Sequence, residues 1–527
     1  MKKWYIVSIF VALLNTAVLA QPADSEINTI TDHNGWGWTS IVQTNGIITL
    51  ATVPDIGARI MQYDLGDQVF FYVNPGEIGK TYIPSQGGFH GFGGYVVWPG
   101  PQYSRWGWPP PPVLDYGAYQ SEIVQNSADS TSVSVSSEIE QWQAPGLRFQ
   151  RRMTVYKGTS RVRVDQSVIN ESSQEQSWSI WDVTQTIANT PRDDFWVYFP
   201  INPNSEHGED GVYFRDNLTS SAWQGEVAPG IYGVVFRPED KKLFADPHKG
   251  WIGYVDEGQS KAYIKTFKIF EGETYPGDNG GGRVQVYLGT SYFEVEVASP
   301  IADLAASGGQ YSFRQDWYTT TMNGPILDVS KAGAIEKQLC QNPQTENIEG
   351  TFGVFHIGTA KLVTKDDSGT ILTEGTTHNI TPLEKLEINE SLELPAEMAS
   401  IEIVVYDYTG KEVGSINSVT SEQLTSVEAK TETLPENLIL LQNYPNPFNP
   451  TTTIQFDLNR SKYVQILIYN TNGQLVRLLA NNNFSAGKHK ILWDGKNRNN
   501  FKVPSGIYYC TLKTENYFKT IKLVLLK

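Results

Sequence analysis

Apolar residues recur at every second position through much of this chain, and this period constrains its fold more than any other feature. Because successive side chains of a strand point to opposite faces, a period of two places the apolar residues on one face. The clearest sets are Val133, Val135 and Ile139; Val162, Val164 and Val168; Val284, Val286 and Leu288; and Phe293, Val295 and Val297. The pattern predicts half-buried antiparallel strands.

The composition also favours an all-β fold. The chain has 46 glycines, 28 prolines, 14 tryptophans, 27 tyrosines and 22 phenylalanines, which is typical of short strands joined by tight turns. Residues 330–342 are the exception, because Ile335 and Leu339 lie four apart and predict a short connecting helix. With 527 residues, 40% of them hydrophobic, the chain is long enough for several domains with their own cores.

The charge and the cysteines exclude several classes of function. A net charge of −16 argues against nucleic acids and acidic membranes as partners. Cys340 and Cys510 are too few and too far apart for a disulfide framework or a cysteine zinc site. We expect no cofactor and no defined metal site. The acidic stretches 193–194 and 207–210 could hold calcium, but we interpret them as solvated turns.

The N-terminus predicts export. Lys2 and Lys3 precede an apolar stretch at residues 4–14, and Ala20 ends a segment suited to signal peptidase. We interpret residues 1–20 as a signal peptide. A membrane anchor is the alternative, but it needs about 20 apolar residues, and this stretch is shorter. We expect no membrane-spanning segment in the mature chain.

Composition divides the rest of the chain. Twelve of the 14 tryptophans lie between Trp36 and Trp317, which suggests a large β-sandwich over residues 28–325. A small β-sandwich is predicted at residues 350–419, a polar linker at 420–439 and a last module at 440–527. Residues 404–413 and 467–476 share a spacing of Tyr, Asx, Gly and Val that is typical of a β-hairpin. The two small modules are therefore predicted to be immunoglobulin-like sandwiches.

The last module carries a resemblance to a known family. Its run Tyr444-Pro445-Asn446-Pro447-Phe448-Asn449-Pro450, the Trp493-Asp494-Gly495 turn and the closing strand resemble the C-terminal sorting domain of type IX secretion cargo. The resemblance implies that residues 440–527 engage the type IX secretion machinery. The protein would then be secreted or held on the outer-membrane surface of a Gram-negative bacterium. A C-terminal adhesion or scaffold module is the alternative.

The first module has its own resemblance. Residues 53–60, Gly93-Gly94-Tyr95, Trp98-Pro99-Gly100-Pro101-Gln102 and residues 178–185 look like an uncharacterised family of the galactose-mutarotase-like superfamily. The resemblance spans about residues 35–320. It implies a β-supersandwich with a concave face the size of a sugar, without an established reaction.

Glycine, proline and aromatic residues between positions 87 and 112 make the densest candidate site. Glycines let a backbone approach a ligand closely, and aromatic rings suit the apolar faces of sugars. We expect a carbohydrate ligand, either only bound or also turned over; if the protein is catalytic, His90 is the proton donor and Asp182 the base or orienting group. The substrate-binding candidates are Arg59, Trp98, Gln102, Trp106, Trp108 and Gln185. The alternative is a loop that packs over one end of a sandwich.

True mutarotases pair a histidine acid with a glutamate base, since ring opening needs one proton supplied and one removed. No second histidine fits that pattern, although His33, His207 and His248 lie on plausible loops. Asp278 stands on a suitable loop but is not a glutamate. Glu294 and Glu296 share one strand face, and we interpret them as a surface pair that faces solvent.

Two other functions stay open. A polysaccharide lyase, or an accessory protein of a glycoside hydrolase, would use cationic side chains to hold uronates or sulfates. The candidates are Arg148, Arg151, Arg152, Arg161 and Arg163, although Arg161 and Arg163 alternate with valines as on a solvated sheet face. The third hypothesis is a structural surface protein without a ligand.

Overall fold

The structure is a computed structural model of the whole chain. It describes residues 21–189, 193–205, 207–208, 211–215, 220, 222–277, 282–426, 439–458, 462–471, 474–484, 487–498, 500–514 and 518–526. The predicted signal peptide, residues 1–20, lies outside this part of the chain.

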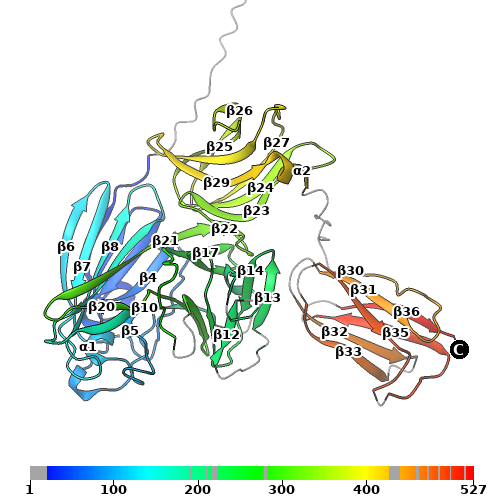
Figure 1. Cartoon of the computed structure of the whole chain (residues 1–527), viewed down its shortest axis with the longest axis horizontal. Coiled ribbons are helices and arrows are strands. Elements are labelled where there is room, and N and C mark those ends of the chain that lie inside the picture. Colours follow the sequence, from blue (N-terminus) through cyan, green and yellow to red (C-terminus); the bar gives the residue numbers. More distant parts are fainter. Residues whose placement is uncertain are drawn as a thin grey trace, which may run out of the picture.

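Two large antiparallel sheets that pack face to face make up the first module (Figure 1). The first sheet has the order β1-β2-β3-β4-β5-β10-β19-β18-β15-β12, and β20 pairs with β10. Its strands are β1 (Glu26–Thr31), β2 (Thr39–Thr44), β3 (Ile48–Val53), β4 (Arg59–Leu65), β5 (Tyr95–Gly100), β10 (Gln176–Ile187), β12 (Val212–Phe214), β15 (Lys241–Ala245), β18 (Val284–Leu288), β19 (Tyr292–Ala298) and β20 (Ala302–Leu304).

The second sheet has the order β13-β14-β11-β16-β17-β21-β9-β8-β7-β6. Its strands are β6 (Gln120–Ser127), β7 (Ser130–Ser136), β8 (Leu147–Tyr156), β9 (Val162–Asn170), β11 (Phe195–Pro200), β13 (Trp223–Ala228), β14 (Ile231–Val235), β16 (Trp251–Asp256), β17 (Lys261–Phe267) and β21 (Gly309–Thr321). The connection from β5 to β6 carries the short helix α1 (Pro112–Asp115).

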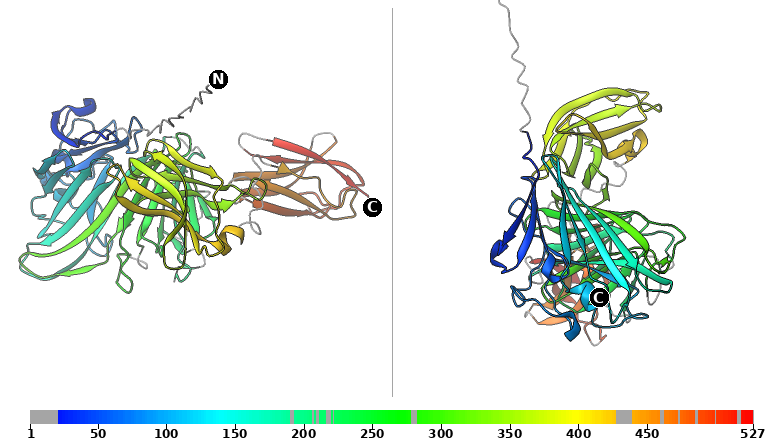
Figure 2. Two further views of the ribbon diagram at one scale, coloured as in Figure 1. Left: turned by 90° about the horizontal axis from the view of Figure 1, so that it is seen from above. Right: turned by 90° about the vertical axis from the view of Figure 1, so that its left-hand side faces the viewer.

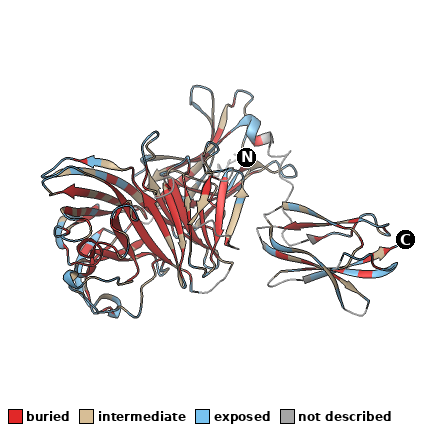
Figure 3. Cartoon of the chain, turned by 60° about the horizontal axis from the view of Figure 1, so that its bottom comes forward, coloured by how far each residue is buried: buried red, intermediate tan, exposed pale blue. Residues whose placement is uncertain are grey.

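The core between the two sheets is rich in aromatic rings. Tyr95 of β5 meets Trp317 of β21 edge to face at 4.7 Å between ring centroids, and Tyr63 of β4 meets Tyr263 of β17 at 5.7 Å. All four side chains are buried, and burying one large apolar side chain stabilises a fold by about 2 kcal/mol. Figure 3 shows the buried strands of this double layer in red.

The alternation in the sequence predicts these strands well. The valines of β18 and β19, at positions 284, 286, 295 and 297, are completely buried, while Ile139 lies beyond β7 and is exposed. The prediction of an all-β fold is confirmed.

The second module consists of two four-stranded sheets. Its strands are β22 (Asp328–Val329), β23 (Gly333–Gln341), β24 (Ile348–Val354), β25 (Gly358–Lys365), β26 (Ile371–Ile380), β27 (Lys385–Glu390), β28 (Ser400–Asp407) and β29 (Glu412–Thr420). The prediction of a helix at residues 330–342 is wrong. A spacing of four places Ile335 and Leu339 on one face of a strand as well as of a helix, and both are buried on β23.

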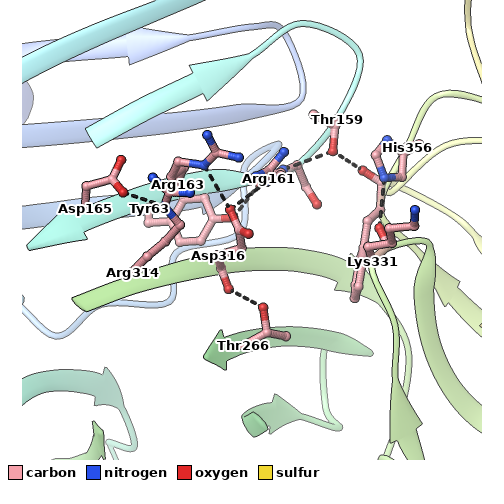
Figure 4. Close-up of polar contacts among 12 residues, drawn as sticks. Tyr63, Thr159, Arg161, Arg163, Asp165, Thr266, Arg314, Asp316, Lys331 and His356 are labelled. Atoms are coloured by element: carbon pink, nitrogen blue, oxygen red, sulfur yellow. Dashed lines mark hydrogen bonds and ion pairs between the residues drawn. The ribbon is translucent and has the colours of Figure 1, made fainter. Parts of the chain in front are cut away.

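Polar contacts join the first two modules (Figure 4). The hydroxyl of Thr159 donates a hydrogen bond to the carbonyl of Phe355 at 2.7 Å, and the ring of Phe355 stacks on Tyr318 at 4.2 Å. His356 forms an isolated bridge with Thr159 across the contact, and within the second module one of its ring nitrogens lies 3.0 Å from the carbonyl of Lys331. The second module therefore packs against the outer face of the second sheet, where Trp196, Tyr318 and Phe355 share one buried apolar cluster.

The third module is a small sandwich with its own core (Figure 2). Its strands are β30 (Ile439–Leu440), β31 (Thr452–Leu458), β32 (Lys462–Asn470), β33 (Leu475–Phe484), β34 (Gly487–Trp493), β35 (Gly506–Lys513) and β36 (Phe518–Leu525). The start of the predicted linker forms the helix α2 (Ser421–Ser426), and residues 427–438 lie outside the described part.

Both predicted hairpins are present in the small sandwiches. In the second module β28 pairs with β29, and Gly410 in the turn has a φ of +83°, which favours glycine. In the third module β32 pairs with β33, and the turn residues Asn472 and Gly473 are not described.

Candidate functional site

A pocket of about 350 Å³ opens on the outer face of the first sheet, the face that points away from the inter-sheet core. On β19, Phe293 and Val295 point into the core, whereas Tyr292 and Glu294 line the pocket. The same alternation turns Lys242 of β15 outward. Neighbouring strands β5, β10, β19, β18, β15 and β12 thus form the floor.

Aromatic rings make one wall of the pocket. They come from β5, β10 and the loop at residues 89–108, and they are Phe89, Trp98, Tyr103, Trp108 and Trp181. Trp98 packs edge to face on Trp181 at 5.2 Å, and Phe89 lies 4.7 Å from Trp108 between ring centroids. The side chain of Trp108 is 56% exposed. The wall therefore presents ring surface to a ligand, although most of the loop behind it is packed.

Polar groups line the opposite side. Arg215 lies 3.6 Å from the carboxylate of Asp240, which also accepts a hydrogen bond from the hydroxyl of Tyr287 at 2.7 Å. Gln102 and Gln285 add amide groups to the lining. The pocket thus combines aromatic surface with donors and acceptors of both charges.

A pair of glutamates from β19 lies at the centre of the floor. Glu296 is buried, and its Oε2 accepts hydrogen bonds from Lys242 Nζ at 2.8 Å and Trp181 Nε1 at 2.7 Å. Glu294 accepts a hydrogen bond from Gln185 Nε2 at 2.8 Å and lines the pocket. Burial, and then the negative charge of Glu296, raise the pKa of Glu294 to about 8.

Glu294 is therefore protonated at neutral pH and can donate a proton or a hydrogen bond. The expectation that Glu294 and Glu296 face solvent as a surface pair is wrong. Their period of two shows that they share a face, but not that loops and neighbouring strands enclose that face. Alternation with valines indicates only that both glutamates point away from the core, so the sequence carried no signal for the enclosure.

Four of the predicted substrate-binding residues lie at or beside this pocket. Trp98, Gln102 and Trp108 line it, and Gln185 contacts it through its hydrogen bond to Glu294. Trp106 is buried behind the wall, where its ring stacks on Trp181 at 6.5 Å and its Nε1 donates to the carbonyl of Pro99.

The structure does not bring His90 to the pocket lining. Its ring stacks on Tyr82 at 3.4 Å between centroids and lies edge to face with Tyr116 at 4.8 Å. His90 is therefore not placed to serve as a proton donor in this pocket, whereas Glu294 lies in its lining. Of the other histidines considered, His33, His207 and His248 do not line the pocket either, and Asp278 is not described.

Arg59 has a positioning role in this structure. It is buried, and its guanidinium lies 2.5 Å from Asp115 Oδ1 of α1. The same Oδ1 accepts a hydrogen bond from Trp98 Nε1 at 2.9 Å. Arg59 thus holds a carboxylate that fixes the Trp98 ring, and it does not reach the pocket.

Asp182 points away from the pocket. Because it follows Trp181 on β10, the pleat turns it to the opposite face, between the two sheets. There its carboxylate lies 2.5 Å from Lys265 Nζ and also accepts hydrogen bonds from Gln315 and the Val297 amide. All of Asp182 is buried, so the role of base or orienting group in the pocket does not fit it.

The arginine cluster is engaged in structural contacts. Arg161 and Arg163 approach Asp316 at 2.7 and 3.8 Å beside the second module (Figure 4). Arg148 pairs with Glu171, and buried Arg151 donates to the carbonyl of Gly57. None of these arginines lines the pocket.

Within the described ranges, no group of three or more His, Cys, Asp or Glu side chains is placed to hold a metal ion. The Asp193 carboxylate of the first acidic stretch pairs with Arg237 at 2.5 Å, and Glu209 and Asp210 of the second are not described. No helix in the described part is long and apolar enough to cross a membrane.

Comparison with solved structures finds several proteins of similar length to the first module. One is the Slr1438 protein of Synechocystis sp. PCC 6803, with 10% identity over 60% of this chain and 100% of that chain, at a TM-score of 0.37. Another is a galactose mutarotase-like protein of Clostridium acetobutylicum, with 12% identity over 57% and 99%, at a TM-score of 0.37. A third is a galactose mutarotase-like protein of Lactobacillus casei, with 10% identity over 53% and 99%, at a TM-score of 0.36.

The search of curated proteins gave no match. The family that matches this sequence is the FlgD Ig-like domain, over residues 446–517, and its description names no sorting function. The prediction of an immunoglobulin-like sandwich at the C-terminus is confirmed, and residues 446–517 are similar to FlgD Ig-like domains.

Proposed function

We propose that the pocket on the outer face of the first sheet binds a carbohydrate. One observation carries the proposal: exposed aromatic rings and the carboxyl group of Glu294 line the same hollow. Aromatic faces pack against the C–H face of a sugar ring, while carboxyl and amide groups bond its hydroxyls. A volume of about 350 Å³ is in the range of small-molecule sites.

The contacts of the arginines and of Trp108 weigh against the other two hypotheses. The arginine cluster supports a lyase, but its members Arg148, Arg151 and Arg161 contact the protein's own groups, and none of the cluster lines the pocket. A purely structural loop would pack its tryptophans inside, whereas Trp108 is exposed at the pocket.

A second candidate function is proton transfer on the bound sugar. Glu294 holds its proton at neutral pH, and the ion pair of Glu296 with Lys242 stands directly beside it. Such a group can protonate a ring or leaving oxygen, which is the acid half of epimerase-type or hydrolytic chemistry. Turnover of a bound glycan that Glu294→Gln abolishes, with binding retained, would establish this function.

The test of binding begins with a glycan array and continues with titration of the glycan that binds. Trp108→Ala removes ring surface from the pocket, so we expect the variant to bind the glycan about tenfold more weakly than the wild type. Trp142→Ala is the matched control, since Trp142 is 49% exposed and does not line the pocket. No binding to any glycan, or equal affinity of the Trp108→Ala variant and the wild type, would overturn the proposal.

We also propose that residues 440–527 direct export through the type IX secretion machinery and that residues 1–20 are cleaved. The support is the run of prolines at residues 445–450, the closing strand and the separate core of the third module. Expression of the full chain and of a chain ending before residue 440, in a bacterium with this machinery, tests it. The shortened chain should remain in the periplasm, and its appearance outside the cell would refute the proposal.

A further inference from the structure

A second hollow lies beside the sugar pocket. It has a volume of about 450 Å³, and Trp36, Gln62, Asp64, Tyr72 and Ile187 are among its lining residues. Gln62 and Asp64 alternate on β4 with Tyr63, which points into the inter-sheet core. By this alternation the hollow opens on the same outer face of the first sheet as the sugar pocket.

A pair of stacked rings joins the two cavities. Tyr72 lines the second hollow, Tyr292 lines the first, and their rings stack at 5.2 Å between centroids with an angle of 28°. Tyr292 pairs in the sheet with Ile187, which also lines the second hollow, and the amide of Tyr72 donates to the carbonyl of Gln185 at 2.9 Å. Both rings are half-buried, so they form a low aromatic ridge between the cavities.

Asp64 orients a polar group of the second hollow. Only 4% of the residue is exposed, its Oδ1 is shielded from solvent, and the backbone amide of Phe70 interacts with its carboxylate. The other oxygen, Oδ2, accepts from Gln62 Nε2 at 2.5 Å. Asp64 therefore holds the Gln62 amide, which lines the hollow and can bond a ligand hydroxyl.

The remaining polar groups of the hollow are uncharged. Gln62 Oε1 accepts from Asn34 Nδ2 at 3.2 Å and lies 2.6 Å from His33 Nε2, so a network orients the amide that meets Asp64. Among the described residues no lysine or arginine lines this hollow, in contrast to the sugar pocket with Arg215 and Lys242. This lining suits a neutral unit rich in hydroxyl groups.

We propose that the second hollow is a further sugar subsite, so that the protein binds an oligosaccharide that crosses the Tyr72–Tyr292 ridge. This inference rests on the proposed function of the first pocket. The first pocket holds one end of the glycan among the tryptophans, the ridge supports the linkage, and a neutral sugar unit bonds the Gln62 amide through a hydroxyl.

The test compares affinities for single sugars with those for their linear oligomers, with cello-, xylo- and galacto-oligosaccharides as probes. Wild-type affinity should rise about tenfold or more from the single sugar to the oligomer. Val69, which is 44% exposed and lines the second hollow, can be changed to Trp to fill it without disturbing the core. V69W and Q62A should lower oligomer affinity about tenfold and leave the single sugar unaffected.

The control variant is Ile123→Trp, since Ile123 is 42% exposed on β6 and lines neither cavity. The subsite proposal is refuted if wild-type protein binds the single sugar and the oligomer equally well, or if V69W leaves oligomer affinity unchanged. Either result leaves the proposed function of the first pocket intact. Absence of binding by every probe overturns both. Trp108→Ala should lower affinity for the single sugar, whereas V69W should not. This difference assigns single-sugar binding to the first pocket independently of the second hollow.

Discussion

Glu294 and Glu296 lie two residues apart on the pocket face of β19, and Lys242 neutralises the charge of Glu296 while Glu294 keeps its proton. Glu296 is buried and Glu294 is half-buried beside it, so two negative charges on this strand face are costly. The pair therefore shares one negative charge at neutral pH. A proton that is held in a sugar-sized pocket is the most chemically distinctive feature of this site.

The stability of the protein should depend on the Glu294 proton. Its pKa is raised from 4.5 to about 8, so the folded state binds the proton more tightly than the unfolded chain. This contribution is complete below about pH 4.5 and is lost as the pH rises through about 8. Melting temperatures measured between these limits should fall with pH in the wild type and fall less in Glu294→Gln. Glu122→Gln, at an exposed position, is the control, and equal slopes in both variants would contradict the assignment.

Asp182 should matter for stability rather than for ligand binding. Asp182→Asn leaves Lys265 charged and unpaired between the sheets, which costs about 3–5 kcal/mol of unfolding free energy. Chemical denaturation measures this loss. Asp165→Asn is the matched control, because its partner Arg314 is 60% exposed and such a pair contributes under about 1 kcal/mol. A glycan affinity that drops with Asp182→Asn in the folded protein would count against the placement of this residue.

The sequence predicted the strands of the large sandwich because alternation reports directly which side chains share a face. It did not predict what covers the outer face of the first sheet, since the loop at residues 89–108 packs there through contacts far apart in the chain. Glu294 and Glu296 were for that reason interpreted as solvent-exposed. Asp182 was predicted for the site because it is a polar residue within the aromatic segment 178–185, but adjacent residues of a strand point to opposite faces, and Asp182 faces the core.

His90→Ala should leave glycan affinity within about twofold of the wild type. The ring of His90 stacks on Tyr82 and does not line the pocket, so its removal costs packing rather than ligand contacts. Titration with the glycan that the array identifies measures the affinity, and Trp108→Ala supplies the positive control. If His90→Ala loses as much glycan affinity as Trp108→Ala, the prediction is wrong and His90 contributes to ligand binding.

The contact between the first two modules should weaken in mild acid because of His356. Burial lowers the pKa of His356 below its usual 6.5, against the opposing effects of the Lys331 carbonyl and Asp407, while the positive charges of Arg161 and Lys331 lower it further. The folded state therefore favours the neutral ring, and this stability is present above about pH 6.5 and lost as the pH falls toward the lowered pKa. Melting temperatures between about pH 5 and pH 7.5 should decline less in His356→Gln than in the wild type. His378→Gln, whose ring pairs with Glu390 at 3.4 Å within the second module, is the control. The prediction fails if His356→Gln keeps the wild-type decline.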